Sequence, residues 1–245
     1  MHTTKYTITF VLILSAAVAL LLTGFREGTK DLAKAGEEIF NKRAILKTIS
    51  SELGSEVSDL SAEQVEEIFN TKIDQKVLNM SGDVLDKAAV ENAGYKGGRA
   101  IDVEIAKEKK KPEAQRILPM FVYNGDKEKL YIVSVIGTGL WDIIWGNVAI
   151  RSDKSTIVGV SFDHAGETPG LGAEIKDNPK YPAMFAGKKI YDDSGTYISI
   201  TSRKGGAVDP DHDVDGLSGA TVTADGVTEM MKRGLKYYEA YLAEN

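Results

Sequence analysis

An uncharged run of 20 residues near the amino terminus, Tyr6–Phe25, constrains the chain more than any other feature. Its centre, from Ile8 to Leu22, is almost wholly apolar, and Lys5 and Arg26 flank the run. At a rise of about 1.5 Å per residue, such a helix spans about 30 Å, the thickness of a bilayer core. The run therefore predicts a single membrane-spanning helix. The alternative is a cleaved signal peptide, but no clear small-x-small cleavage site follows Leu22.

The charges beside this helix bear on its orientation. Only Lys5 and the amino terminus precede it, whereas five basic residues follow it: Arg26, Lys30, Lys34, Lys42 and Arg43. By the positive-inside rule, this distribution keeps the carboxyl-terminal part in the cytoplasm. A large following domain can override the bias, so the charges alone leave the side open.

The remaining sequence has the composition of a folded protein. Apolar residues make up 42% and charged residues 27%, which excludes a disordered chain and a fully membrane-embedded one. A net charge of -6 argues against a nucleic-acid partner. Because cysteine is absent, disulfides, thiolate metal sites, cysteine nucleophiles and lipoprotein acylation are excluded, and three histidines argue against a multi-histidine metal site. Redox or transfer chemistry then needs a cofactor, or oxygen and nitrogen side chains.

Residues 27–96 have helical spacing and are predicted to form a membrane-proximal helical segment. Ser61 and Gln64 form a capping-box pattern ahead of an apolar face that continues to Ile73. Glycines at positions 94, 97 and 98 mark its end. The basic run that follows, Lys107 to Lys111, lacks an apolar or aromatic partner face, so a solvated loop is preferred over a phosphate or lipid contact.

After residue 117, apolar residues recur at every second position, the pattern that is typical of strands. Two hairpins are expected, Ile117–Tyr123 with Leu130–Ile136 and Ile143–Ile150 with Thr156–Phe162, and another strand at Tyr197–Thr201. A final amphipathic helix presents one apolar face: Val227, Met230, Met231, Leu235, Tyr238, Tyr241 and Leu242. The predicted fold class is α+β, an antiparallel sheet with helices packed on it.

Three glycine-containing loops hold the candidate chemistry, and the first runs from Asp215 to Thr223. Its glycines and small side chains let a ligand approach the backbone closely. The loop leads into the final helix, whose N-terminal N–H groups and dipole would face Thr221 and favour a phosphate. It is not a Walker loop, because the required Gly-Lys-Ser/Thr is missing. The alternative is a small-residue turn with Thr223 as the helix N-cap.

The second loop, Gly166–Gly172, contains three glycines and a proline. Glu167 and Thr168 would present polar groups and Leu171 an apolar contact, which suits a planar aromatic ligand with a polar rim. A turn-rich connection is the alternative. A third loop ends in Trp141, which could form the wall of an aromatic pocket, although core packing is the preferred interpretation for a tryptophan on sequence alone.

Together these loops resemble the FMN-binding domain family, and within it the C subunits of Na+-translocating NADH:quinone oxidoreductases. Asp215 to Thr221 matches the D-x-x-S/T-G-A-T flavinylation motif, and Glu167 to Gly172 matches the E-T-P-G-L-G loop. Gly139 to Trp141 matches a G-L-W segment, and Lys204 to Ala207 resembles a segment that precedes the flavinylated loop. The similarity covers about residues 97–242, and the single N-terminal helix also fits. The stretch that begins at His164 departs from the family pattern, so no role is carried over to that histidine.

The resemblance implies FMN linked through its phosphate to Thr221 as a phosphodiester, installed from FAD by a separate Mg-dependent flavin transferase. The candidate contacts of the phosphate are Ser218, Gly219, Ala220 and Thr223. The candidate contacts of the flavin ring are Glu167, Thr168, Leu171, Gly172, Trp141 and Lys204. We expect the Lys204 ammonium to favour an anionic reduced flavin, with simple solvation as the alternative. No metal ligand and no protein acid, base or nucleophile for substrate turnover is expected.

The implied function is an electron relay between NADH and quinone, coupled to Na+ export, in a complex with the other subunits of the oxidoreductase. The family places the FMN domain in the periplasm, on a single helix in the cell inner membrane, and we prefer this placement to the charge bias. The predicted domains are residues 1–26, the N-terminus and membrane helix; 27–96, the helical segment; and 97–245, the FMN-binding domain.

Two alternatives remain open. The G subunit of an Rnf-type electron transport complex shares the single anchor and covalent FMN, but the helical segment and the G-L-W segment favour the Na+-translocating family. A membrane-anchored FMN-binding regulatory module would bind flavin without transferring electrons. The chain has neither a dinucleotide fingerprint nor a transmembrane bundle large enough for quinone, so both end substrates are expected to bind elsewhere.

Overall fold

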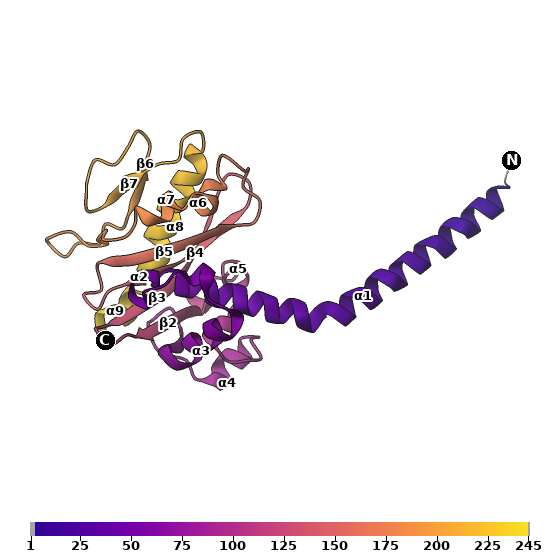
Figure 1. Cartoon of the computed structure of the whole chain (residues 1–245), viewed down its shortest axis with the longest axis horizontal. Helices are drawn as coiled ribbons and strands as arrows, with labels where there is room; N and C mark the ends of the chain where they lie inside the picture. Colours follow the sequence, from indigo (N-terminus) through magenta and orange to yellow (C-terminus); the bar gives the residue numbers. More distant parts are fainter. Residues whose placement is uncertain (1–2, 245) are drawn as a thin grey trace. The chain divides into compact units, whose positions relative to one another are not determined.

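The computed structural model describes residues 3–244, which form two compact units, one up to Phe40 and one from Asn41 onward. The first unit consists of most of helix α1, Thr4–Lys47, a continuous helix of 44 residues (Figure 1). Its most apolar window has a mean hydropathy of 2.5, and none of that window is buried. The helix is therefore long and apolar enough to cross a membrane, as the sequence predicted.

The second unit is built on a five-stranded antiparallel sheet in which each strand pairs with its neighbour in the sequence (Figure 1). The strands are β1 Ile73–Leu78, β2 Leu118–Asn124, β3 Lys129–Thr138, β4 Ile143–Ile150 and β5 Ile157–His164. Both predicted hairpins are confirmed. Their turns are short, so the register of β2 to β5 is set locally by turn residues and alternating side chains.

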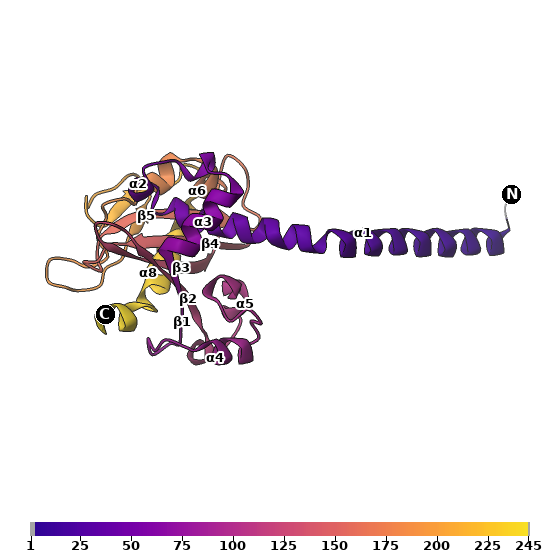
Figure 2. The same cartoon turned by 60° about the horizontal axis from the view of Figure 1, so that its bottom comes forward.

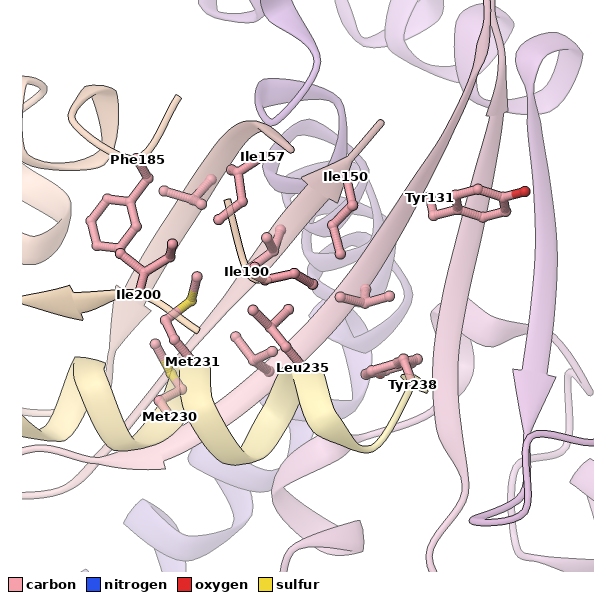
Figure 3. Packing of buried hydrophobic residues seen from close by; sticks show 14 of the residues in the cluster. Tyr131, Ile150, Ile157, Phe185, Ile190, Ile200, Met230, Met231, Leu235 and Tyr238 are labelled. Carbon is pink, nitrogen blue, oxygen red and sulfur yellow. The ribbon is translucent and has the colours of Figure 1, made fainter. Parts of the chain in front are cut away.

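Both faces of this sheet are buried, because successive strand residues point to opposite sides. Met120 and Val122 of β2 belong to one hydrophobic cluster, whereas Phe121 and Tyr123 belong to the other. Helix α8, Thr221–Lys236, covers the first face; Figure 3 shows its apolar side chains projecting into the cluster that contains Ile190 and Ile200. The short α6 Glu174–Asp177 and α7 Lys180–Ala183, with the parallel pair β6 Thr201–Arg203 and β7 Asp213–Asp215, complete this side.

The second face is covered by helix α3, Ala62–Lys72, and by the last turns of α1, which belong to the second unit (Figure 2). Ser61 and Gln64 form the predicted capping box: Ser61 N–H donates to Gln64 Oε1 at 2.8 Å, and Gln64 N–H donates to Ser61 Oγ at 3.3 Å. The remaining short helices are α2 Ser50–Leu53, η1 Val57–Asp59, α4 Lys87–Asn92, η2 Ala100–Asp102, α5 Ile105–Glu108 and η3 Glu113–Gln115.

Three predicted elements differ in the structure. Residues 73–78, expected to be helical, form β1 and pair with β2, so part of segment 27–96 belongs to the sheet. Tyr197–Thr201 is not a strand, because Ser199 has a φ of 71°, which interrupts extended backbone; β6 begins only at Thr201. The terminal helix is divided into α8 and α9, Glu239–Glu244, although all seven predicted face residues are buried. The division into domains at positions 26 and 96 stays a prediction.

Candidate functional site

Helix α8 begins inside the first candidate loop. Ala220 is its N-cap and Thr221 its first helical residue, half-buried at the surface. The Thr221 hydroxyl has no hydrogen-bond partner within residues 3–244. The first N–H groups of a helix have no carbonyl partners inside it and form its positive end, so Thr221 lies where an anion is favoured. Thr223 is not the N-cap; it lies inside the helix and is 1% exposed.

The buried carboxylate of Glu167 joins the three candidate loops. Its Oε1 accepts the backbone N–H of Trp141 at 2.9 Å, and its Oε2 accepts the Thr223 hydroxyl at 2.6 Å. Two glycines leave the space it occupies: a Cβ on Gly139 would lie 2.5 Å from Oε1, and one on Gly172 would overlap Oε2 and lie 2.6 Å from Thr223 Oγ1. Only 5% of Glu167 is exposed. The loops therefore meet at one carboxylate.

The pKa of the Glu167 carboxyl is held below its ordinary value of 4.5. Burial is the largest single influence and raises the pKa, but the influences that lower it, led by hydrogen bonds from the Thr223 hydroxyl and the backbone N–H groups of Trp141 and Asp142, outweigh it in sum. Hydrogen bonds to the ionised form thus keep Glu167 charged at neutral pH, despite its burial.

His164, to which the sequence assigned no role, supports the same loop. It is the last residue of β5, and its Nδ1 accepts the backbone N–H of Glu167 at 3.1 Å. An accepting Nδ1 leaves the ring proton on Nε2. The position of a histidine at the end of a strand, three residues before Glu167, is the only sequence signal that could have indicated this contact.

Trp141 and Leu171 form the exposed side of the cluster. Trp141 is 70% exposed, so the core position preferred from sequence is wrong; the residue lies in a turn beyond β3, where Gly139 N–H donates to Asp142 O at 2.8 Å. Its indole N–H donates to Thr168 Oγ1 at 3.2 Å. Leu171 Cδ2 would lie 3.0 Å from a Cβ on Gly219, whose φ of 74° also favours glycine. Exposed apolar surface thus adjoins the anion-favouring helix end, an arrangement that fits a planar ring with a phosphate.

Lys204 is not brought into the Glu167 cluster. It is exposed and lies after β6, at the start of a glycine turn. The segment is tied to the first loop by hydrogen bonds from backbone N–H groups: Ala207 N–H donates to the Asp215 side chain at Oδ1 at 2.7 Å, and Gly216 N–H donates to Arg203 O at 2.8 Å. Ser218 and Gly219 are exposed beside Thr221. Within residues 3–244, no group of three or more His, Asp or Glu side chains is placed to hold a metal ion.

The basic run at positions 107–111 is only partly the solvated loop that was preferred: Lys107 and Lys110 are exposed, but Lys109 is bonded to the sheet. The Lys109 ammonium donates to Gly137 O and to Thr138 Oγ1, both at 2.6 Å. Burial, followed by the nearby Arg233 and Arg116, lowers the pKa of Lys109. These contacts join the segment after α5 to the end of β3, immediately before the Trp141 turn. Sequence could not indicate them, because a backbone carbonyl 28 positions away leaves no side-chain signature.

Comparison with known proteins matches the same region. The sequence model of the FMN-binding domain family matches residues 139–236, which include the first two loops and the Gly139–Trp141 part of the third. The C subunit of the Na(+)-translocating NADH-quinone reductase of Vibrio vulnificus is 30% identical over 230 residues, covering 91% of this chain and 87% of that protein. The chain belongs to this family, the C subunits of Na(+)-translocating NADH-quinone reductases. The family member from Pseudomonas aeruginosa is 32% identical over 202 residues, covering 75% of each chain.

Two crystal structures of proteins from this family share the fold. The one from Parabacteroides distasonis is 32% identical, with a TM-score of 0.73, and the match covers 88% of this chain and 98% of that one. The NqrC structure from Shewanella oneidensis is 26% identical, with a TM-score of 0.67 over 83% of this chain and 97% of that one. Membership of the NqrC family therefore rests on sequence and on the arrangement of the sheet and helices together.

Proposed function

We propose that this chain is the membrane-anchored flavoprotein subunit of a Na+-translocating NADH-quinone reductase. In that role it relays electrons through FMN between NADH and quinone, coupled to Na+ export and together with the other subunits of the complex. The relatives named for that complex and the FMN-binding domain match support the proposal. When bound, FMN supplies the electron-carrying chemistry. The chain's own residues bind and orient it, and NADH and quinone bind to other subunits.

The observation that carries the proposal is the unpartnered Thr221 hydroxyl at the first position of α8, within the part of the chain that the structure describes. We assign the covalent FMN linkage to this oxygen. A flavin transferase would supply FAD: the Thr221 oxygen bonds to the FMN phosphorus, the bond to AMP breaks, AMP leaves, and the hydroxyl proton is released. The helix dipole then stabilises the remaining phosphodiester charge by roughly 1 kcal/mol, in addition to direct N–H bonds.

The neighbouring residues divide between the two ends of the cofactor. At the phosphate, Ser218 offers an exposed hydroxyl, and Gly219 and Ala220 allow close approach of the backbone. At the ring, Trp141 and Leu171 offer exposed apolar surface. The remaining candidates are Thr168 at the edge of that surface, Glu167, Gly172 and Thr223 beneath it, and Lys204, which is exposed on the adjoining turn.

We also propose that α1 crosses the cell inner membrane once and that the second unit lies in the periplasm. The length and hydropathy of the helix support the span. The periplasmic side is inferred from the family resemblance, which places the FMN domain there, and it is opposite to the side that the charges flanking the helix indicate. A reporter fused after Asn245 that is active only in the periplasm tests the side, and a signal confined to the cytoplasm would contradict it.

Mass spectrometry tests the linkage. In protein co-expressed with a flavin transferase, the peptide that contains Thr221 should have the added mass of FMN, and Thr221→Val should lose it. Thr71→Val, an exposed threonine of α3 whose hydroxyl bonds, among the described residues, only within its own helix, is the matched control and should keep the modification. Unmodified wild-type peptide would overturn the assignment. Co-purification from native membranes then distinguishes a Na+-translocating complex from an Rnf-type one.

A further inference from the structure

Glu167 was expected to contact the flavin ring, but its carboxylate is buried and already bonded to the protein. Both oxygens accept hydrogen bonds from the protein, and only 5% of the residue is exposed. The glycines at positions 139 and 172 close over those oxygens so tightly that a Cβ at either position would overlap them. A ring placed on the exposed side of Trp141 and Leu171 would therefore meet those side chains and not this carboxylate.

The partners of Glu167 come from segments far apart in the chain. Trp141 is 26 positions away and Thr223 is 56 positions away. Within residues 3–244, no hydrogen bond joins the Trp141 turn directly to the first turn of α8; Glu167 is the link between them. Trp141 belongs to the side proposed for the ring, and Thr223 lies two residues after the proposed phosphate attachment.

We propose that Glu167 is a positioning residue whose buried carboxylate locks the Trp141 turn to the first turn of α8. This inference rests on the proposed FMN site. The ring side and the phosphate side of that site are then one rigid unit before any flavin is attached. Lys109 holds the end of β3 immediately before that turn, through Gly137 O and Thr138 Oγ1.

A carboxylate suits this position because every partner is a donor. Trp141 and Asp142 offer backbone N–H groups, and Thr223 offers a hydroxyl proton. Glutamine keeps the shape and one oxygen, and the Thr223 hydroxyl can rotate to accept from its NH2 group. Glu167→Gln should therefore retain much of the link. Glu167→Ala removes it and leaves buried donors without partners, which is costly.

Amide hydrogen exchange of the full-length protein before flavin attachment tests the lock. In Glu167→Ala we expect exchange to accelerate about tenfold or more in peptides covering residues 139–142 and 218–224 together, because each loses a hydrogen bond to a charged group. Peptides from the centre of β3 should not change. Glu167→Gln should restore most of the protection. Glu229→Ala, an exposed glutamate of α8 whose side chain makes no hydrogen bond within the described residues, is the matched control and should resemble wild type.

Thr223→Val keeps the proposal falsifiable if Glu167→Ala does not fold. Among the described residues, Thr223 is joined to the Trp141 turn by hydrogen bonds only through Glu167, so its loss should accelerate exchange at residues 139–142 as well. Acceleration confined to residues 166–172 in Glu167→Ala, or to the start of α8 in Thr223→Val, would overturn the proposal. As a second readout, the fraction of protein that receives FMN should fall about tenfold in Glu167→Ala and recover in Glu167→Gln. Because exchange is measured without flavin, failure of the lock and failure of the Thr221 linkage are separate results.

Discussion

The turn Ser218–Thr221 and the cluster around Glu167 meet at the start of α8, but they are built in opposite ways. Ser218 and Gly219 are exposed, and the Thr221 hydroxyl has no partner within the described chain. Thr223, only two positions later, is buried and bonded to Glu167. Helical residues advance by about 100° each, so these two threonines point to nearly opposite sides of α8. The difference teaches that the Glu167 cluster is already assembled by hydrogen bonds within the protein, whereas the turn before it leaves the hydroxyl of the proposed attachment residue unbonded among the described residues.

The largest expected effect separates those two threonines. Thr221→Val should abolish covalent FMN completely and change the free energy of unfolding of the unmodified protein by no more than about 0.5 kcal/mol. Thr223→Val should lower that free energy by about 1–3 kcal/mol, because it leaves the buried Glu167 carboxylate short of a hydrogen bond. Flavin fluorescence on a denaturing gel and urea unfolding measure the two effects. Equal destabilisation by both variants would remove the contrast.

Two glycines of the second loop sharpen the same comparison. Gly172→Ala places a Cβ against the oxygens of Glu167 and Thr223, both buried and hydrogen-bonded to each other, so we expect a loss of about 2–3 kcal/mol. Gly170→Ala meets no atom within 4 Å and is strained only by its φ of 74°, so about 1 kcal/mol is expected. Thermal unfolding of the unmodified protein compares them. A larger loss for Gly170→Ala would show that the space around Glu167 is not tight.

The pH dependence of stability isolates the charge of Glu167. Because its pKa is lowered in the folded protein, the unfolded chain binds more protons, and stability is lost as pH falls below 4.5 through the folded value. Asp213, whose pKa is also lowered, contributes in the same direction. Wild type should therefore lose stability more steeply on acidification than Glu167→Gln, with a difference on the order of 1 kcal/mol. Parallel pH profiles from urea unfolding would contradict an ionised Glu167 cluster.

The smallest effect concerns Lys204, which lies outside the cluster. Lys204→Met should keep covalent FMN but lower the flavin reduction potential by on the order of tens of millivolts, since an exposed ammonium interacts only modestly with a reduced flavin. Lys127→Met, on the exposed turn between β2 and β3, is the matched control and should leave the potential unchanged. An unchanged potential in Lys204→Met with full flavin occupancy would remove Lys204 from the site and leave the Thr221 assignment intact.

Local patterns were sufficient for much of the fold. The apolar run Tyr6–Phe25, the Ser61 capping box and the two hairpins were all predicted, because each is set by neighbours in the sequence. β1 was missed because it is a strand through its pairing with β2, about 45 positions away, and its own residues alternate weakly. The interruption at Ser199 was missed because a positive φ is uncommon for serine, so the residue type gives no sign of it.

In the candidate site, too, some features could be predicted from the sequence and others could not. The small-residue motif that ends at Thr221, the loop that begins at Glu167 and their likeness to FMN-binding proteins were evident from residue types and spacing. Burial was not evident: Glu167 was expected to be presented and is enclosed, whereas Trp141 was expected in the core and is exposed. The exposure of these side chains depends on how the C-terminal ends of β3 and β5 come together with the first turn of α8. No single segment of the sequence contains that information.

The sequence alone determined the apolar anchor, the strand periods and the motif that places Thr221 at a helix start, because each depends on interactions within a few residues. Only the tertiary structure decided which polar groups would be partners. Glu167 meets Thr223 across 56 positions, and Lys109 meets Gly137 across 28. The physical reason is that a buried charge is stable only with donors or acceptors within hydrogen-bonding distance, and here folding brings those groups together from distant segments.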